Sequence, residues 1–142
     1  MIGPGVLLDT GPLVALLDRN DARHALSRGL FQRCSAPLRT CESVISEASF
    51  LLRKVDRKAP AELAALGRAG VFRVAVSLDQ SWDRVGALLT KYAEVPASLA
   101  DVCLIVCAEV HAEPRILTFD SDFEVYRWSR HRRFEILGLD GE

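Results

Sequence analysis

Three aspartates occupy positions that a parallel sheet would bring to one edge. Asp9 ends one short apolar run, Asp120 ends another, and Asp101 lies in the first turn of a strongly apolar helical stretch. The carboxyl ends of parallel strands meet at one edge, and a helix that returns to the start of a strand begins at that edge. Carboxylates crowded there repel one another, and a divalent cation removes the repulsion. Hard oxygen ligands select Mg²⁺ or Mn²⁺, so the sequence predicts a metal site that activates water for hydrolysis.

A fourth acid is expected from the helical stretch 42–55, which also begins at this edge. Glu42 and Glu47 both qualify by position, but they lie about 140° apart around a helix and cannot share one direction. Glu47 borders the apolar arc that contains Val44 and Leu51 more closely, so we favour Glu47 and leave Glu42 without a firm role. The alternative for Glu47 is a solvated charge on the flank of the helix.

Each aspartate also has a purely structural interpretation. Asp101 can complete a capping box with Ser98, in the pattern Ser-x-x-Asp, although a capping carboxylate still presents one free oxygen. Asp9 can be a turn residue, but a turn does not require a carboxylate there. Asp120 and Asp122 can be loop residues of an Asp-Ser-Asp sequence. An arrangement in which all of these acids are purely structural is less favoured than one in which they share a single site.

The elements that must position these acids alternate along the chain. Short apolar runs are separated by stretches with helical spacing, which indicates parallel β-α units rather than a sandwich or a bundle. We predict an α/β fold with three α/β/α layers and a mainly parallel central sheet, in a single domain over residues 1–142. Strands are expected at 6–9, 37–40, 72–76, 115–119 and 134–137, and helices at 13–18, 21–33, 42–55, 61–69, from 79 or 81 to 92, and at 98–111.

Composition sets outer limits on the function. The chain has 142 residues, of which 49% are hydrophobic and 26% charged, with a net charge of -1. The overall charge therefore does not indicate nucleic-acid binding, and any affinity for a polyanion must come from local basic patches or bound cations. The apolar N-terminal stretch is interrupted by Asp9 and follows no basic segment, which argues against a signal peptide. No run reaches the roughly 18–20 apolar residues of a membrane span.

The cysteines favour reduced, buried thiols over disulfides or zinc ligands. None of the four shows C-x-x-C spacing, and no export signal precedes them. Cys103 and Cys107 lie on one face of an expected helix, but neither His24 nor His131 has a placed partner to complete a zinc site. We therefore expect a cytoplasmic protein. The cysteines are Cys34, Cys41, Cys103 and Cys107.

Four segments in order resemble the pattern of the PIN-domain family, and especially the VapC-type toxin ribonucleases of toxin–antitoxin pairs. Each motif alone is weak, since a lone Asp-Thr-Gly is common, but four in the family order are quite specific. The likeness spans about residues 6–126. The matching stretches are Leu8-Asp9-Thr10-Gly11-Pro12-Leu13-Val14-Ala15-Leu16-Leu17, Val44-Ile45-Ser46-Glu47-Ala48, Ser98-Leu99-Ala100-Asp101-Val102-Cys103-Leu104 and Ile116-Leu117-Thr118-Phe119-Asp120-Ser121-Asp122-Phe123.

This resemblance implies a PIN fold, a Mg²⁺- or Mn²⁺-dependent endoribonuclease, and products with a 5′-phosphate and a 3′-hydroxyl. It also implies an RNA substrate, a cognate antitoxin that blocks the site, and a homodimer. Residues 61–70 and the apolar N-terminal helices are the candidate surfaces for these protein contacts. The implied roles are catalysis by Asp9, Glu47, Asp101 and Asp120, metal ligation by Asp9, Asp101, Asp120 and Asp122, and support from the hydroxyls of Thr10 and Thr118.

Two basic clusters can hold RNA phosphates. The first joins Arg53 and Lys54 to Arg57 and Lys58. The second follows the last aspartates, and its interleaved aromatic residues suit stacking on bases. For both clusters the alternative is a solvated basic surface. The second cluster contains Arg127, Arg130, Arg132 and Arg133, with Tyr126, Trp128 and His131 between them.

Three other functions fit the sequence less well. A haloacid-dehalogenase-type phosphatase needs a second aspartate two residues after the first, where this chain has Gly11. A receiver domain needs an early acidic pair and an aspartate on a middle strand, and neither is apparent. The stronger rival is a PIN-fold module that binds protein or RNA without cutting, and the intact acidic set argues against it.

Overall fold

A five-stranded parallel sheet forms the centre of the computed structural model, which describes residues 1–139. The strand order is β3-β2-β1-β4-β7, and all four neighbouring pairs are parallel. The predicted α/β class and mainly parallel sheet are thus confirmed; the single domain was predicted to 142, and residues 140–142 lie outside the described part. The strands are β1 (Leu7–Leu8), β2 (Leu38–Thr40), β3 (Phe72–Val74), β4 (Arg115–Leu117) and β7 (Glu135–Leu137).

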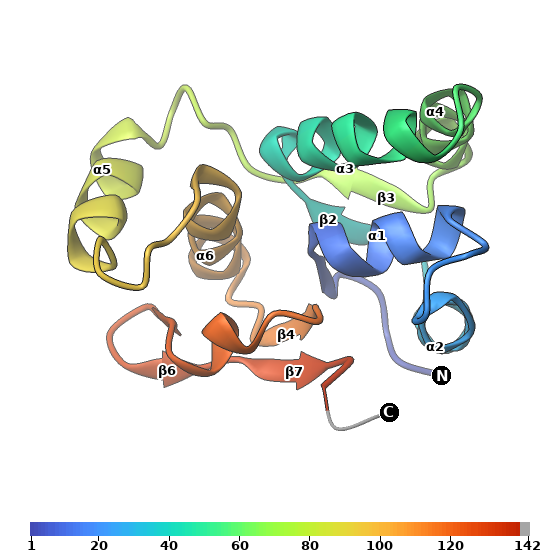
Figure 1. Cartoon of the computed structure of the whole chain (residues 1–142). Coiled ribbons are helices and arrows are strands. Elements are labelled where there is room, and N and C mark those ends of the chain that lie inside the picture. Colours follow the sequence, from blue (N-terminus) through green and yellow to red (C-terminus); the bar gives the residue numbers. More distant parts are fainter. Residues whose placement is uncertain (140–142) are drawn as a thin grey trace.

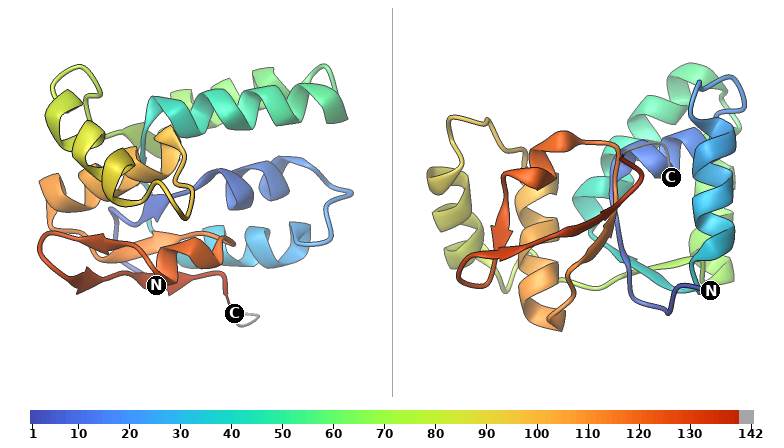
Figure 2. Two further views of the ribbon diagram at one scale, coloured as in Figure 1. Left: turned by 60° about the vertical axis from the view of Figure 1, so that its left-hand side comes forward. Right: turned by 90° about the horizontal axis from the view of Figure 1, so that it is seen from below.

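Helices cover both faces of this sheet and make three layers (Figures 1 and 2). The helices α1 to α4 pack on one another over one face, and α5 and α6 pair over the other. Nine consecutive residues of α6, 100–108, are buried, which explains why this stretch is apolar all round. The helices are α1 (Thr10–Leu17), α2 (His24–Arg33), α3 (Glu42–Val55), α4 (Ala59–Ala69), α5 (Trp82–Lys91) and α6 (Leu99–His111).

The segment after β4 differs most from the sequence prediction. It forms a short 3₁₀ helix, η1 (Ser121–Glu124), and a small antiparallel hairpin of β5 (Arg127–Trp128) and β6 (Arg132–Arg133). Two-residue strands carry no periodic pattern. The turn places Ser129 and His131 at positive φ, and such residues are not the glycines and asparagines that usually indicate a hairpin turn. The hairpin was therefore missed.

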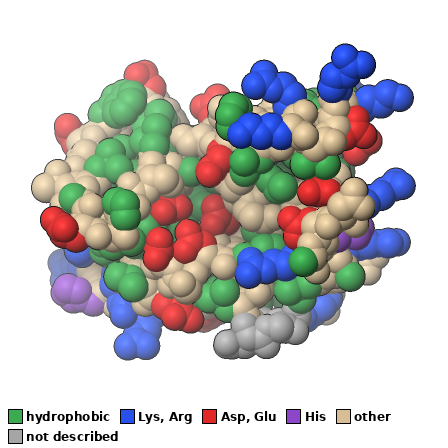
Figure 3. All heavy atoms as spheres, in the orientation of Figure 1, with side chains coloured by type: hydrophobic (Ala, Val, Ile, Leu, Met, Phe, Trp, Pro, Cys, Tyr) green, Lys and Arg blue, Asp and Glu red, His purple; other side chains and the backbone are tan. Residues whose placement is uncertain are grey.

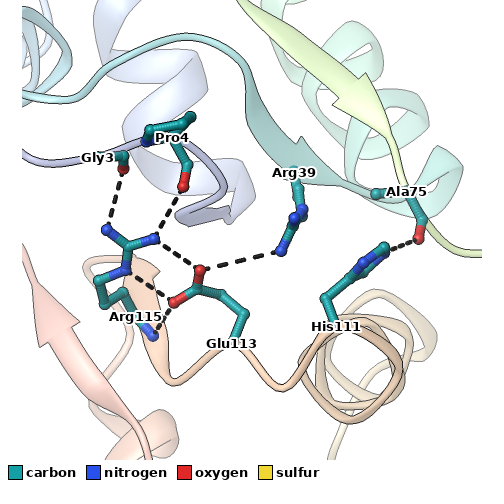
Figure 4. Close-up of polar contacts among 7 residues, drawn as sticks. All are labelled: Gly3, Pro4, Arg39, Ala75, His111, Glu113 and Arg115. Carbon is teal, nitrogen blue, oxygen red and sulfur yellow. Dashed lines mark hydrogen bonds and ion pairs between the residues drawn. The ribbon is translucent and has the colours of Figure 1, made fainter.

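The amino end of the sheet is held by a polar network on the side away from the acids (Figure 4). Glu113 is buried and accepts hydrogen bonds from the Arg115 guanidinium at 2.7 and 2.8 Å, while Arg39 lies 4.0 Å away. The same guanidinium donates to the carbonyls of Gly3 and Pro4 at 3.0 and 2.9 Å. This network ties the N-terminal segment to the start of β4 and leaves the carboxyl edge to the acidic residues.

Two further predictions bear on the interior and the membrane. The four cysteines are free and buried, as expected. Within residues 1–139, no helix combines the length and the apolar character needed to cross a bilayer.

Candidate active site

Three aspartates meet at the carboxyl edge of the sheet, as the sequence predicted. Asp9 directly follows β1, and Asp120 follows β4, its neighbour in the sheet. Asp101 comes from the first turn of α6. One carboxylate oxygen from each lies within 4.8 Å of the others, and this is the only such trio of possible metal ligands in the described part of the chain.

Asp9 is buried and caps the start of α1. Its Oδ1 accepts a hydrogen bond from the Thr10 backbone N–H at 2.8 Å, which is why α1 begins at Thr10 rather than at the predicted Leu13. Burial raises the pKa of Asp9 from 3.8 to about 6, and the nearby Asp101 and Asp120 add to the rise. A hydroxyl and a backbone N–H lower it, but less than burial raises it. The carboxylate is therefore held in surroundings that disfavour its charge unless a cation is present.

Thr118 connects two of the three aspartates. Its hydroxyl is fully buried and donates to Asp9 Oδ2 at 2.6 Å. The same oxygen accepts a hydrogen bond from the Asp120 backbone N–H at 3.0 Å. Gly138 packs against the Thr118 carbonyl with φ of 113°, and a Cβ there would approach that oxygen to 2.5 Å. Thr118 thus ties Asp9 to the backbone of Asp120, and its supporting role in catalysis stays a prediction. Gly138 is a neighbour that the sequence analysis missed.

Asp101 combines the structural and the functional interpretations. It forms the capping box with Ser98, whose hydroxyl accepts from the Asp101 N–H at 3.0 Å. Asp101 Oδ2 accepts from the Ser98 N–H at 3.4 Å and from the Tyr126 hydroxyl at 2.8 Å. Burial raises the pKa of Asp101, and the phenol and the cap oppose the rise. Burial and the adjacent carboxylates also raise the pKa of Tyr126, so that its hydroxyl stays protonated and donates.

The two remaining predicted aspartate positions lie at the start of η1. Asp120 caps this short helix, and its Oδ1 accepts from the Asp122 backbone N–H at 2.9 Å. Asp122 lines the same hollow but is outside the close trio. Partial burial, together with Asp120 and Asp101, raises the pKa of Asp122. The charges of Asp120 and Asp101 therefore act on Asp122, although Asp122 does not belong to the close trio.

The structure separates the two candidate glutamates. Glu47 lines the hollow that contains the aspartates, and its Oε2 accepts a hydrogen bond from the Thr10 hydroxyl at 3.1 Å. Glu42 lies outside this hollow and lines neighbouring grooves beside Phe50 and Val74, one of which Glu47 also borders. The angular argument that favoured Glu47 agrees with this placement.

The hollow at the carboxyl edge is strongly acidic. Its volume is about 630 Å³, and five carboxylates but no Lys, Arg or His line it among the described residues. In Figure 3, acidic side chains gather near the middle of this face, whereas Lys and Arg side chains gather over α3 and α4. The lining residues are Asp9, Thr10, Gly11, Glu47, Leu51, Pro96, Ser98, Asp101, Phe119, Asp120, Ser121 and Asp122.

This donor set fits a hard divalent cation. Mg²⁺ binds oxygens at about 2.0–2.1 Å and Ca²⁺ at about 2.3–2.6 Å, so opposite ligands of one ion lie roughly 4–5 Å apart. The spread of up to 4.8 Å among the three carboxylates is compatible with one shared ion. Among residues 1–139, no basic side chain lines the hollow to neutralise them. Oxygen-only ligands favour Mg²⁺ or Mn²⁺ over zinc.

The basic segment after η1 is organised differently from the predicted RNA-stacking cluster. Tyr126 and Trp128 are buried, so the expectation that they stack on RNA bases is wrong. One nitrogen of the Arg127 guanidinium donates to three backbone carbonyls. The Ser129 N–H donates to Glu109 in the last third of α6, roughly 12 Å along the helix from Asp101. The turn of the hairpin thus lies well away from the acidic rim.

The exposed charges leave two basic surfaces. Arg130, Arg132 and Arg133 are exposed on the hairpin, and the Arg132 guanidinium lies over the Trp128 ring, 5.3 Å from its centroid. The first cluster is also exposed, at the end of α3 and before α4. RNA contact by either surface remains a prediction. The first cluster comprises Arg53, Lys54, Arg57 and Lys58.

The sequence matches the model of the PIN domain family over residues 6–129. The chain therefore belongs to the PIN domain family. Among solved structures, the fold is similar to VapC20 of Mycobacterium tuberculosis, a toxin described as cleaving the sarcin–ricin loop. The TM-score is 0.76 at 22% sequence identity, over 85% of this chain and 94% of that one. No curated protein sequence matches the chain significantly.

Proposed function

We propose that this PIN-domain chain is an endoribonuclease that hydrolyses RNA phosphodiester bonds with Mg²⁺ or Mn²⁺. The observation that carries the proposal is the meeting of Asp9, Asp101 and Asp120 in a hollow that is lined by five acids and, within the described part of the chain, by no basic side chain. The family and the similarity to a ribonuclease toxin support the same activity. Like-charged carboxylates held this close, two of them buried, favour a bound cation as part of the working site.

The metal would be held mainly by Asp9 and Asp120, which come from neighbouring strands, with Asp101 completing the set. When bound, Mg²⁺ or Mn²⁺ would engage the scissile phosphate, lower the pKa of a water ligand and stabilise charge on the leaving oxygen. Asp122 lies at the edge of the hollow and would hold a second ion or its water. As the resemblance to the PIN family implies, the products would carry a 5′-phosphate and a 3′-hydroxyl.

The other residues of the hollow would orient these ligands. Thr118 fixes the Asp9 carboxylate and the backbone of Asp120 through one hydroxyl. Thr10 donates to Glu47, and this leaves Glu47 Oε1 to accept a proton from a water beside the phosphate. No Ser-His-Asp arrangement is required, because water rather than a side chain is the nucleophile.

The substrate would approach over basic surfaces outside the acidic hollow. The exposed arginines of β6, with Arg130, offer phosphate contacts on one side, and the first basic cluster offers them on the other. Arg127 contributes mainly to the fold of its own loop, given its three carbonyl contacts, and its predicted RNA contact is the least supported of the four arginines.

Cleavage of an end-labelled RNA panel tests the proposal, with a sarcin–ricin-loop hairpin as one member. We expect cutting in Mn²⁺ or Mg²⁺, none in EDTA, and none by Asp9→Asn. Asp83→Asn, an exposed aspartate of α5 outside the hollow, is the matched control and should cut as the wild type does. Cutting that persists in EDTA or in Asp9→Asn would refute the nuclease.

The same experiment also tests the non-catalytic alternative. A PIN-fold module that only binds would shift RNA in a gel without shortening it, in Mn²⁺ as well as in EDTA. The intact set of acids favours the enzyme, because a binding module for a polyanion gains nothing from five carboxylates in one hollow.

We also propose that the chain is the toxin of a toxin–antitoxin pair, acts in the cytoplasm as one PIN domain, and forms a homodimer. The large exposed apolar side chains do not lie in residues 61–70 or on the N-terminal helices, the surfaces suggested by the sequence. They include Phe50 on α3, Val74 on β3, Trp82 on α5 and Val110 on α6, with exposures of 47–63%. Grooves that Phe50 shares with Val74, Val74 with Val110, and Val110 with Trp82 join these side chains. This surface is the better candidate for the dimer contact, since large exposed apolar patches mark association surfaces.

Light scattering after size exclusion tests the dimer. We expect about twice the monomer mass for the wild type, and a monomer when Phe50 and Trp82 are both replaced by aspartate. A monodisperse wild-type monomer at micromolar concentration would refute the homodimer without affecting the proposed chemistry.

A further inference from the structure

Tyr126 is a fully buried phenol whose ring is fixed by other aromatic residues. It makes edge-to-face contacts with Phe123 and Tyr92, at centroid distances of 5.0 and 4.9 Å. Its backbone N–H donates to the Asp122 carbonyl at 3.1 Å. Such a ring has little freedom to move, so its hydroxyl is held in one place.

That hydroxyl points at one of the candidate metal ligands. It donates to Asp101 Oδ2 at 2.8 Å, a short hydrogen bond, whereas the Ser98 N–H reaches the same oxygen only at 3.4 Å. Both hydrogen bonds that Asp101 accepts from residues 1–139 thus fall on Oδ2. The second oxygen, Oδ1, accepts no hydrogen bond within residues 1–139, so it can serve as a ligand to an ion shared with Asp9 and Asp120.

An aspartate carboxylate is not otherwise confined to one orientation. Rotation about its last side-chain torsion is broad, and the capping box alone would draw Asp101 back toward the backbone of its own helix. The phenol opposes this by holding Oδ2 on the side of the η1 segment. The segment that supplies Asp120 therefore also fixes Asp101, because Tyr126 follows Asp120 by only six residues.

We propose that Tyr126 is a positioning residue for the candidate metal site: its hydroxyl presents Asp101 Oδ1 to the ion that Asp9 and Asp120 also bind. The inference rests on the metal site of the proposed function, but it does not require that the bound RNA be cut. Hydrogen-bond partners of metal ligands orient those ligands, and their loss commonly weakens metal affinity about 10- to 100-fold.

The chain offers two matched controls. Tyr92 belongs to the same aromatic group, and its hydroxyl accepts from the Arg127 N–H at 2.9 Å rather than contacting a site carboxylate. Tyr92→Phe therefore removes a phenol hydroxyl from the same core without touching Asp101. Ser98→Ala removes the other side of the capping box, and should lower stability while leaving the phenol contact in place.

Isothermal titration of the full-length chain with Mn²⁺ at pH 7.5 tests the inference without RNA. We expect Tyr126→Phe to weaken Mn²⁺ binding at least 10-fold, and Tyr92→Phe and Ser98→Ala to stay within about 2-fold of the wild type. Urea unfolding in EDTA shows whether each variant is folded. Because phenylalanine fills the same volume and Asp101 keeps the Ser98 N–H, Tyr126→Phe should fold.

The outcomes separate this inference from the proposed function. Equal Mn²⁺ affinity of folded Tyr126→Phe and wild type would overturn the inference and leave the nuclease proposal standing. A wild type that binds no Mn²⁺ would overturn both. If Ser98→Ala weakens binding as much as Tyr126→Phe does, general loosening of α6 is responsible and the positioning role is refuted. Recovery of Tyr126→Phe cleavage at raised Mn²⁺ would support it further.

Discussion

Replacing Asp9 by asparagine should stabilise the metal-free protein at neutral pH while it abolishes activity. The pKa of Asp9 rises from 3.8 in an exposed chain to about 6 in the folded protein. This difference of roughly 2 pKa units corresponds to about 3 kcal/mol of stability lost when Asp9 is ionised at pH 7.5. An asparagine carries no charge to bury, so the variant does not incur this cost.

Part of this gain in stability is offset because the asparagine loses one hydrogen bond. Asp9 accepts from the Thr10 N–H through one oxygen and from the Thr118 hydroxyl through the other. An amide has only one oxygen, so one of these contacts fails, at a cost of about 1 kcal/mol. The net expectation is that Asp9→Asn is more stable than the wild type by about 2 kcal/mol at pH 7.5 in EDTA.

The raised pKa of Asp9 also determines how the stability difference between Asp9→Asn and the wild type changes with pH. A carboxyl whose pKa is raised on folding contributes stability that is present below pH 3.8 and is lost as pH rises through about 6. The advantage of Asp9→Asn should therefore shrink between pH 7.5 and pH 4 and disappear or reverse at pH 4. Urea unfolding in EDTA at both pH values measures it, with Asp83→Asn as the exposed control. A variant less stable than the wild type at pH 7.5, or a difference that does not change with pH, would show that the buried charge of Asp9 does not destabilise the metal-free protein.

Three further predictions concern the supports of the site and the RNA surface. Thr118→Val removes the buried hydroxyl that donates to Asp9. Urea unfolding should show that the free energy of unfolding falls by about 2–4 kcal/mol, whereas Thr118→Ser should stay close to the wild type. A Thr118→Val variant as stable as the wild type would contradict the bridging role. Glu47→Gln should lower Mn²⁺-dependent cleavage at least about 10-fold. Glu42→Gln changes a residue outside the hollow and should leave cleavage unchanged. Equal effects of the two substitutions would show that Glu47 was wrongly preferred to Glu42 as the fourth acid of the site. Alanines in place of Arg132 and Arg133 of β6 should weaken RNA binding and reduce the slope of log affinity against log salt by roughly 0.7 per lost phosphate contact. An unchanged slope would show that these arginines do not contact RNA phosphates.

The sheet and the trio of acids were predictable because both follow from local pattern and simple topology. Alternating short apolar runs and helical stretches predicted the parallel sheet. Once the strands are parallel, Asp9 and Asp120 must reach one edge, and the helix that returns to β4 must start there with Asp101. The angle around a helix was enough to prefer Glu47 to Glu42.

The segment after Asp120 was less predictable because long-range packing decides it. A tyrosine and a tryptophan among arginines suggested a nucleic-acid surface, but Tyr126 and Trp128 turn inward onto α6 and the aromatic group around Phe123. The contact between Tyr126 and Asp101 joins residues 25 positions apart, and no periodic pattern reports it. Gly138 was likewise inconspicuous, since its importance depends on the Thr118 carbonyl that approaches it.

The most direct test is the anomalous diffraction of crystals grown or soaked in Mn²⁺. We expect a manganese peak between Asp9, Asp101 and Asp120, about 2–2.6 Å from a carboxylate oxygen of each, and no such peak in crystals of Asp9→Asn. Well-ordered wild-type crystals that contain Mn²⁺ elsewhere but none between these carboxylates would contradict it.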